Sequence, residues 1–170
     1  MVDEALLQWR HGKDEAFAQD GQSPLDPEAI SQFEGLRYYD ANPALRFEVT
    51  IAPYDQIHSV EMETSTGQPA TYERYGQVAF SVDGHAVALT VFRDPQQAGW
   101  FLPFRDATSG GETYGAGRYV ELEEEGGGFV LDFNYAYNPF CAYSPHWVCP
   151  VPPAENRLAV AIAAGEKSYS

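Results

Sequence analysis

Lysine is nearly absent from this sequence, and basic residues as a whole are few. The 170 residues include only two lysines, Lys13 and Lys167, and 10 lysines and arginines stand against 25 acids, which gives a formal net charge of −15. A field of that sign repels phosphate backbones and anionic membrane surfaces, so we expect neither nucleic acid nor a membrane as a partner. We interpret the acidic surface as adaptation to a salt-rich cytosol, as in a halophile, because salt screens repulsion between like charges.

Long apolar runs are missing too, and none approaches the ~20 residues that a membrane-spanning helix requires. The first residues, MVDEALLQWRHGKDEAF, are acidic at the start and interrupted by charges, which is not the pattern of a signal peptide. We therefore expect a cytoplasmic protein. A chain of 170 residues is most simply one domain, and it is long enough to bury a core without metals or disulfides.

Aromatic residues, by contrast, are abundant, with 11 tyrosines and 10 phenylalanines that favour strands. From Leu45 onward apolar and polar residues alternate, as in LRFEVTIAP, which is typical of antiparallel strands with one solvent-facing side. Asp83-Gly84 predicts a two-residue hairpin turn that pairs Phe80 with Val87. Glycines 126–128 mark a second hairpin, and further strands are expected at GWFLPF, GRYVELE, GFVLDFNY and RLAVAIAAG.

These segments predict a mainly β fold, an antiparallel β-barrel or strongly curved sheet of about eight or nine strands. Residues 1–35 are expected to form a helical N-terminal segment, with one helix over Asp3–Asp20 and a short second helix that has Asp26 as N-cap and Pro27 as its first residue. Residues 36–170 are expected to form the barrel-like body, with the first helix packed against it.

Arg118 lies on the apolar side of the strand GRYVELE, by strict alternation with Val120 and Leu122. An inward-facing arginine needs a carboxylate, carbonyls or an anionic ligand as its partner, because an unpaired charge is costly at low dielectric. A three-residue turn after this strand, which we favour slightly over a two-residue turn, would set Arg118 opposite Asn134 and diagonal to Asp132. Both a structural ion pair and a ligand clamp fit this pattern.

Two loops are expected to surround this arginine. The glycine-rich segment 104–119, FRDATSGGETYGAGRY, lacks the lysine of a P-loop and precedes a strand, so we interpret it as an ordered loop over the barrel mouth. Segment 135–156 is stiffened by five prolines and leaves little room for regular structure. The residues that we predict to bind a ligand between these loops are Tyr114, Arg118, Asn134 and Asn138.

Cysteine occurs only as Cys141 and Cys149, with His146 between them. The three are weak candidates for zinc ligands, because their spacing matches no standard zinc motif and a fourth ligand such as His58 or His85 would be needed. A disulfide is disfavoured in a reducing cytosol, and the tendency of cysteine to be buried favours two packed thiols. Buried thiols, a disulfide and a metal-bound or nucleophilic cysteine all stay open, and no cofactor is expected.

Catalysis has no specific signature here. Neither a GxSxG nucleophile motif nor a paired Ser-His-Asp pattern is present. A nucleophilic Cys141 or Ser144 would need a neighbouring base, for which His146 is nearest in sequence. Carboxylates are so common in this chain that pairs of them arise by chance. The candidate catalytic residues are therefore Glu112, Asp132 and Cys141.

Two C-terminal blocks, FRDATSGGETYGAGRY and DFNYAYNPFCAYSPHWVCPVPPAENRL, resemble a known family. Together with AIAAGEKSY near the end and WR, SPL and FEGLRYYD near the start, they are similar to a widespread prokaryotic domain of unknown function, DUF1684. The resemblance covers nearly the whole chain and implies no activity. It marks the same two loops as the residue patterns, and it counts against His146 as a ligand, since similar sequences carry other residues there.

Three functions fit these observations. The first, which we favour, is a small-molecule-binding β-barrel with a partly apolar pocket near Arg118, capped by the 104–119 and 135–156 loops. The second is an enzyme without an organic cofactor, a hydrolase or isomerase that uses Glu112, Asp132 or Cys141. The third is a zinc-stabilised or purely structural interaction module.

Overall fold

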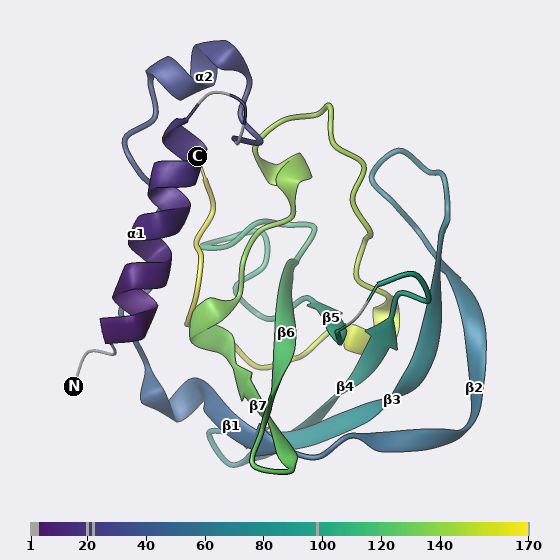
Figure 1. Cartoon of the computed structure of the whole chain (residues 1–170). Coiled ribbons are helices and arrows are strands. Elements are labelled where there is room, and N and C mark those ends of the chain that lie inside the picture. Colours follow the sequence, from purple (N-terminus) through teal and green to yellow (C-terminus); the bar gives the residue numbers. More distant parts are fainter. Residues whose placement is uncertain (1–3, 20, 22, 98, 170) are drawn as a thin grey trace.

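The computed structural model of the protein describes residues 4–19, 21, 23–97 and 99–169. In this part of the chain seven strands form one antiparallel sheet, in the order β1-β7-β6-β5-β4-β3-β2, which curls into a half-barrel (Figure 1). The strands are β1 (Arg46–Val49), β2 (Ala52–Met62), β3 (Ala70–Val82), β4 (His85–Arg93), β5 (Phe101–Phe104), β6 (Arg118–Glu125) and β7 (Gly128–Asp132). The predicted mainly β fold with a strongly curved sheet is confirmed.

The inner face of the curl holds the main core. Alternate side chains of adjoining strands pack there, such as Leu102 of β5 and Val120 of β6, which are paired in the sheet and fully buried. Phe133 and Ile162, from segments that follow the last strand, complete this core. Burying one such side chain contributes about 1.5–3 kcal/mol, so the alternation fixes which face of each strand turns inward.

The strand count is seven rather than the eight or nine predicted, because segment 157–165, RLAVAIAAG, forms no strand beyond one isolated bridge at its start. Leu158, Ile162 and Ala164 are buried in alternation with exposed residues, as in a strand, and Leu158 and Val160 bind the main chain of Arg105 and Ala107, but from Ile162 onward side chains take part instead. The N–H of Ile162 donates to Asp106 Oδ2 at 2.6 Å, and the carbonyl oxygen of Ile162 accepts from Arg118 at 2.8 Å. At Ile162 and Ala164, hydrogen bonds to side chains therefore take the place of the main-chain ladder of a sheet.

The first hairpin forms as predicted. Asp83 and Gly84 make a two-residue turn with φ angles of 50° and 80°, and Phe80 pairs with Val87. Both angles lie in the left-handed region that a type I′ turn requires.

The second hairpin departs from the prediction. Glu125 pairs with Gly128, so the turn holds two residues, Gly126 and Gly127, and the expected three-residue turn is wrong. Glycine at both turn positions permits φ angles of 59° and 84° without strain, which makes the shorter turn the favourable one.

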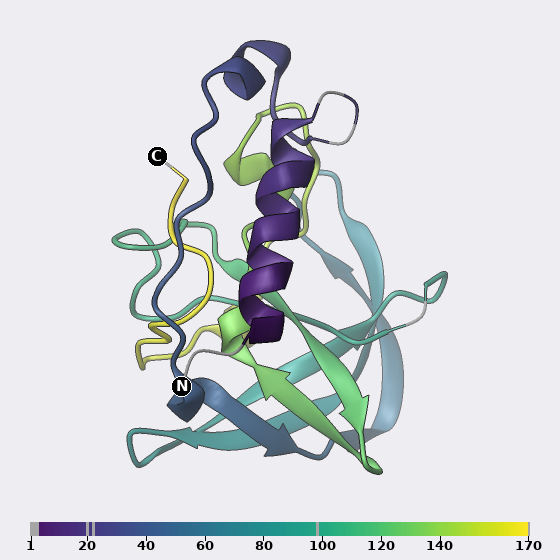
Figure 2. The same ribbon diagram turned by 60° about the vertical axis from the view of Figure 1, so that its left-hand side comes forward.

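Two helices precede the sheet, α1 (Glu4–Ala18) and α2 (Pro27–Ser31). Figures 1 and 2 show α1 standing beside the body with α2 above it. The predicted end residues of the first helix, Asp3 and Asp20, lie outside the described residues. Pro27 begins α2 as predicted, and Asp26 before it has extended backbone. No helix in the described segments is long and apolar enough to span a membrane.

Short 3₁₀ turns punctuate the irregular segments: η1 (Pro43–Leu45), η2 (Phe133–Tyr135), η3 (Phe140–Ala142) and η4 (Ala154–Asn156). Near the end of the chain the tail runs antiparallel to an early segment, with Tyr38 bridged to Glu166. The tail therefore lies between the N-terminal segment and the sheet, where it meets Arg118.

Candidate functional site

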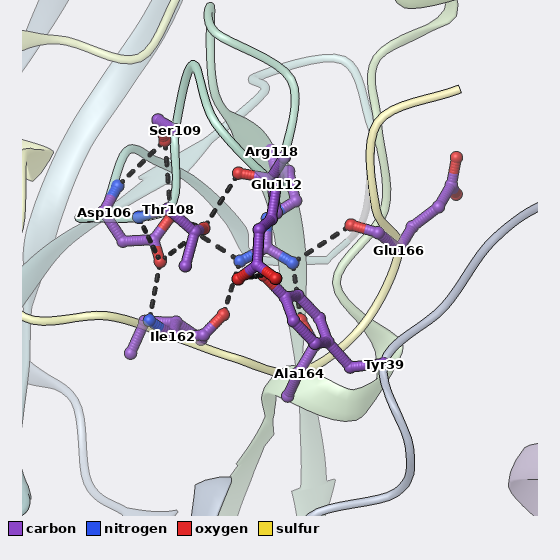
Figure 3. A network of polar contacts seen from close by, with 10 residues as sticks. Tyr39, Asp106, Thr108, Ser109, Glu112, Arg118, Ile162, Ala164 and Glu166 are labelled. Carbon is purple, nitrogen blue, oxygen red and sulfur yellow. Dashed lines mark hydrogen bonds and ion pairs between the residues drawn. The ribbon is translucent and has the colours of Figure 1, made fainter. Parts of the chain in front are cut away.

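Arg118 is fully buried at the start of β6, where its guanidinium binds the C-terminal tail (Figure 3). Nη1 donates to the carbonyl oxygens of Ala164 and Glu166, and Nη2 donates to that of Ile162 at 2.8 Å. Nη2 also lies 3.6 Å from Oδ1 of the buried Asp106. Burial lowers the pKa of Arg118, and the Asp106 carboxylate opposes that shift. The guanidinium thus supplies hydrogen bonds to three main-chain carbonyl oxygens of the tail.

Asp106 ties the glycine-rich loop to the same tail. Its carboxylate accepts hydrogen bonds from the hydroxyl of Thr108 at 2.8 Å, from that of Ser109 at 3.3 Å and from the N–H of Ile162 (Figure 3). Further along the loop, the exposed Glu112 accepts a hydrogen bond of 2.8 Å from the hydroxyl of Tyr39. Segment 104–119 is accordingly an ordered loop, held by side chains of its own and by the tail.

The expected meeting of Arg118 with Asp132 and Asn134 is wrong. Arg118 pairs with Phe104 of β5, and β7 ends at Asp132 before it reaches that level of β6. Asn134 turns away into η2, where its amide exchanges two hydrogen bonds with the main chain of Asn42. Asp132 accepts from the N–H of Asn134, as an N-cap does.

Glu166 forms a second buried polar cluster between α1 and the tail. One oxygen accepts from Lys13 Nζ at 2.7 Å, and the other accepts from Asn138 Nδ2 at 2.8 Å and from the hydroxyl of Tyr143. Burial raises the pKa of Glu166, and Lys13 opposes that shift. The ammonium of Lys13 also lies 5.1 Å from the ring centroid of Tyr137. These contacts fasten the N-terminal helix to the rest of the protein.

A groove of about 540 Å³ lies on the outer face of the sheet, on the side of β6 opposite to the Arg118 side chain. Pairing with β5 puts Arg118 and Val120 on the core face, and it puts Tyr119 and Glu121 on the outer face. Seven aromatic side chains line the groove: Tyr72, Trp100, Phe101, Tyr119, Tyr137, Phe140 and Trp147.

The rings form a continuous row from the sheet to the proline-rich segment. Phe101 stacks on Tyr72 at 5.4 Å and meets Tyr119 edge-on at 4.8 Å, and Tyr119 in turn meets Tyr137 at 5.8 Å. The hydroxyl of Tyr119 donates to the carbonyl oxygen of Pro150, which fixes the segment above the sheet. Ring pairs at these separations add about 0.5–1.5 kcal/mol each, so the floor of the groove is rigid.

The rim of the groove is acidic. Asp94, Glu121 and Glu123 contribute carboxylates, and no lysine, arginine or histidine occurs among the described residues that line it. The hydroxyl of Tyr137 donates to Glu121 at 3.0 Å, and burial together with that carboxylate raises the pKa of Tyr137. Asn138 also lines the groove, and its side-chain oxygen is buried without a partner among the described residues. The arrangement attracts positive charge.

Cys141 and Cys149 are free thiols, of which Cys149 lines this groove and Cys141 lies next to Cys149. The N–H of Cys141 donates to Cys149 Sγ at 3.2 Å, and the hydroxyl of Tyr114 lies 3.7 Å from Cys141 Sγ. The hydrogen bond from Cys149, helped by that from Tyr114, lowers the pKa of the Cys141 thiol to about 6. The pKa of Cys149 is raised, because its thiol forms a hydrogen bond with Cys141 and because Cys149 is buried.

His146 does not join the two cysteines. It is exposed, and its Nε2 lies 3.7 Å from Asp26 Oδ1. Within the described residues, no group of three or more histidine, cysteine, aspartate or glutamate side chains is arranged to hold a metal ion.

The candidate catalytic residues contact different partners. Glu112 binds Tyr39, and Cys141 binds Cys149. Asp132 and Arg46 line a second hollow of about 380 Å³, which adjoins the aromatic groove because Glu121, Glu123 and Tyr137 line both. Of the four predicted ligand-binding residues, only Asn138 lines the aromatic groove, whereas Tyr114, Arg118 and Asn134 make the contacts described above.

The groove was not predicted from the sequence, because a pocket was expected only on the inward face of the strands, near Arg118. The available signal was the set of large aromatic residues at outward positions, such as Tyr119 beside the inward Arg118 and Phe101 beside the inward Leu102. Outward aromatic residues on neighbouring strands predict a second, outer layer, which here is the proline-rich segment.

Two comparisons place the protein among its relatives. The model of a family described as a protein of unknown function, DUF1684, matches residues 31–167. The chain belongs to the DUF1684 family. Its fold is similar to the solution NMR structure of an uncharacterized protein of Haloarcula marismortui, with 39% sequence identity, a TM-score of 0.72 and coverage of 96% of this chain and 92% of that chain. No curated protein matches the sequence. The DUF1684 resemblance noted in the sequence is thereby confirmed.

Proposed function

We propose that this DUF1684 protein binds a small organic molecule with an aromatic or flat apolar part and a positively charged group, in the groove above Tyr119. The observation that carries this proposal is the combination of seven aromatic side chains with three carboxylates, and with no basic side chain among the described lining residues. The volume of about 540 Å³ suits a small-molecule site, which typically measures about 300–1,000 Å³.

The aromatic lining supports the apolar half of the ligand. The rings of Phe140 and Trp147 meet edge-on with their centroids 5.1 Å apart, and the two residues stay 43% and 40% exposed although both are large and apolar. Exposed aromatic side chains at the mouth of a groove are typical of binding sites, because a ligand that covers them removes apolar surface from water. Faces of tyrosine and tryptophan rings also attract cations.

The acidic rim supports the charged half. Carboxylates of Asp94, Glu121 and Glu123 on one groove produce a local negative potential that raises the concentration of cations and repels anions. Arg118 lies on the other face of β6 and is occupied by the tail, so it supplies no anion site in this groove.

We also propose that the acidic surface is an adaptation to high salt. The support is the net charge of −15 and the halophilic source of the similar structure, Haloarcula marismortui. The excess of negative charges is much larger than the three carboxylates of the groove, so attraction of a ligand alone does not account for it.

Three fragments that share one ring test the binding proposal: benzylammonium, benzyl alcohol and benzoate. Each is titrated into the full chain at the lowest salt concentration that keeps it folded, and the fluorescence of its three tryptophans is recorded, of which Trp100 and Trp147 line the groove. Benzylammonium is expected to bind with a Kd of about 1 mM, as suits so small a ligand, and benzoate at least about fivefold more weakly. Equal affinities for the cation and the anion would contradict the proposal.

A further inference from the structure

Cys141 and Cys149 are separated by eight positions in sequence, yet the fold brings the main-chain N–H of Cys141 into a hydrogen bond with the Cys149 sulfur. The 3₁₀ turn η3 carries Cys141, and its N–H points at Cys149 Sγ at 3.2 Å. Cys149 is held from the other side, because its N–H donates to Ser65 Oγ and its carbonyl oxygen accepts from the N–H of Ser65. The segment that joins them is thus already closed into a loop.

The two thiols have unequal surroundings. Cys141 is half-buried and faces the hydroxyl of Tyr114 at 3.7 Å, whereas Cys149 is only 7% exposed and lines the aromatic groove. Hydrogen bonds to Cys141 favour its thiolate, and Cys149 keeps its proton. A partly exposed thiolate beside a protonated thiol is the arrangement that oxidants select in reversible cysteine chemistry.

We propose that Cys141 and Cys149 form a redox-active pair that a hydroperoxide converts reversibly into a disulfide. The Cys141 thiolate attacks one oxygen of hydrogen peroxide and breaks the O–O bond. The leaving hydroxide combines with the proton that the Cys141 thiol released to the solvent on ionisation and becomes the first water, and Cys141 becomes a sulfenic acid. Cys149 then attacks that sulfur as a thiolate, the S–O bond breaks, and the second hydroxide leaves as water with the proton that Cys149 releases. Two thiol sulfurs are oxidised by two electrons in all, and one peroxide is reduced to two waters.

Tyr114 is a positioning residue in this account, because its hydroxyl contacts the thiolate without taking part in bond exchange. The disulfide would form inside the segment that carries Phe140 and Trp147, the two exposed rings at the mouth of the groove. Oxidation would therefore alter the wall of the proposed binding groove. The redox chemistry does not depend on the ligand, so its test is independent of the test of the binding proposal.

The test is oxidation of the reduced full chain by a small excess of hydrogen peroxide, followed by blocking of free thiols with N-ethylmaleimide, intact mass measurement and peptide mapping. The expected product is a monomer lighter by about 2 Da, with a Cys141–Cys149 cross-link, no reactive thiol and full recovery in dithiothreitol. Unchanged thiols, direct overoxidation to sulfinic acid, or a disulfide between two chains would each overturn the proposal.

Two variants assign the roles. Cys149→Ser should stop the reaction at the sulfenic acid of Cys141, which dimedone traps, and Cys141→Ser should slow peroxide consumption by about tenfold or more, because Cys149 is rarely a thiolate. Tyr114→Phe should slow the first step while leaving the cross-link product unchanged. Dimedone labelling of Cys149 rather than Cys141 would reverse the assignment and contradict the mechanism. Brief alkylation of the wild-type protein followed by peptide mapping compares the reactivity of Cys141 with that of Cys149 without any variant.

Discussion

Arg118 and Tyr119 are neighbours on β6 whose side chains lie on opposite faces of the sheet. The first is fully buried and binds the carbonyl oxygens of the tail, and the second forms the floor of the aromatic groove. One strand thereby joins the contact that holds the C-terminus to the surface that we propose as the binding site. The two roles can be separated by substitution, because each side chain contacts a different part of the protein.

Arg118→Gln is expected to destabilise the protein by about 3–5 kcal/mol, because it leaves three tail carbonyls and the Asp106 carboxylate without their donor. Urea unfolding monitored by circular dichroism measures the loss. The matched control is Arg46→Gln, which removes only a surface ion pair of 3.6 Å with Glu125 and should cost less than about 1 kcal/mol. Equal costs for the two variants would show that Arg118 does not hold the tail.

Gly165→Ala is expected to destabilise the tail more than an ordinary turn substitution does. Gly165 has a φ of 81°, and a Cβ there would lie 2.7 Å from the carbonyl oxygen of Phe133 and 2.8 Å from that of Ala136. Gly127→Ala is the control, since its φ of 84° is similar and nothing lies within 4 Å of the added Cβ. We expect about 1 kcal/mol for Gly127→Ala and at least about 2 kcal/mol more for Gly165→Ala, by the same unfolding assay. A smaller cost for Gly165→Ala would contradict the close packing there.

The sequence predicted most of the sheet, because alternation and turn chemistry are local. Asp83-Gly84 determined the register of its hairpin, and strict alternation placed Arg118 inside. The partners of Arg118 could not be predicted, since Ala164 and Ile162 follow it by more than 40 positions and belong to a segment whose pattern is that of a strand. Local pattern indicates which face a residue occupies, but only tertiary packing determines which distant carbonyls meet it.

The groove was equally hidden, for a different reason. Its floor comes from strands and its roof from segment 135–156, whose path depends on contacts such as that between Tyr119 and Pro150. The nearness of Cys141 to Cys149 likewise depends on the turn at η3. The sequence left buried thiols, a disulfide and a metal-bound or nucleophilic cysteine open; the structure shows two free thiols, and their redox activity is our proposal.

Alkylation of Cys141 by iodoacetamide should rise as the pH increases through about 6 and level off above pH 7, because the folded protein lowers the pKa of this thiol and only the thiolate reacts. The rate at each pH is obtained by quenching samples at set times and measuring the alkylated fraction of the Cys141 peptide by mass spectrometry. Tyr114→Phe should move the midpoint to higher pH, since one hydrogen bond to the thiolate is lost. A midpoint near 8.5 in the wild-type protein, as in an ordinary cysteine, would contradict the proposed surroundings.

Stability should rise with potassium chloride, because screening reduces the repulsion among 25 acids that only 10 bases offset. We expect a gain of about 1 kcal/mol or more between low and molar salt, which for a chain of this size shifts Tm by about 2–4 °C. Thermal unfolding followed by circular dichroism measures it. Glycine betaine, a zwitterion that does not screen charge, serves as the control, and an equal gain in betaine would argue against the electrostatic explanation.

The most direct test of the binding proposal is an NMR titration of the isotope-labelled full chain with benzylammonium. We expect amide shifts at residues 119–123 and 137–150, and a two- to fivefold weaker affinity, about 0.4–1 kcal/mol, in Glu123→Gln. Glu124→Gln, one position along the same strand and outside the groove lining, should bind like the wild-type protein. Shifts scattered over the surface, or an equal response to benzoate at the same residues, would contradict a cation-binding groove above Tyr119.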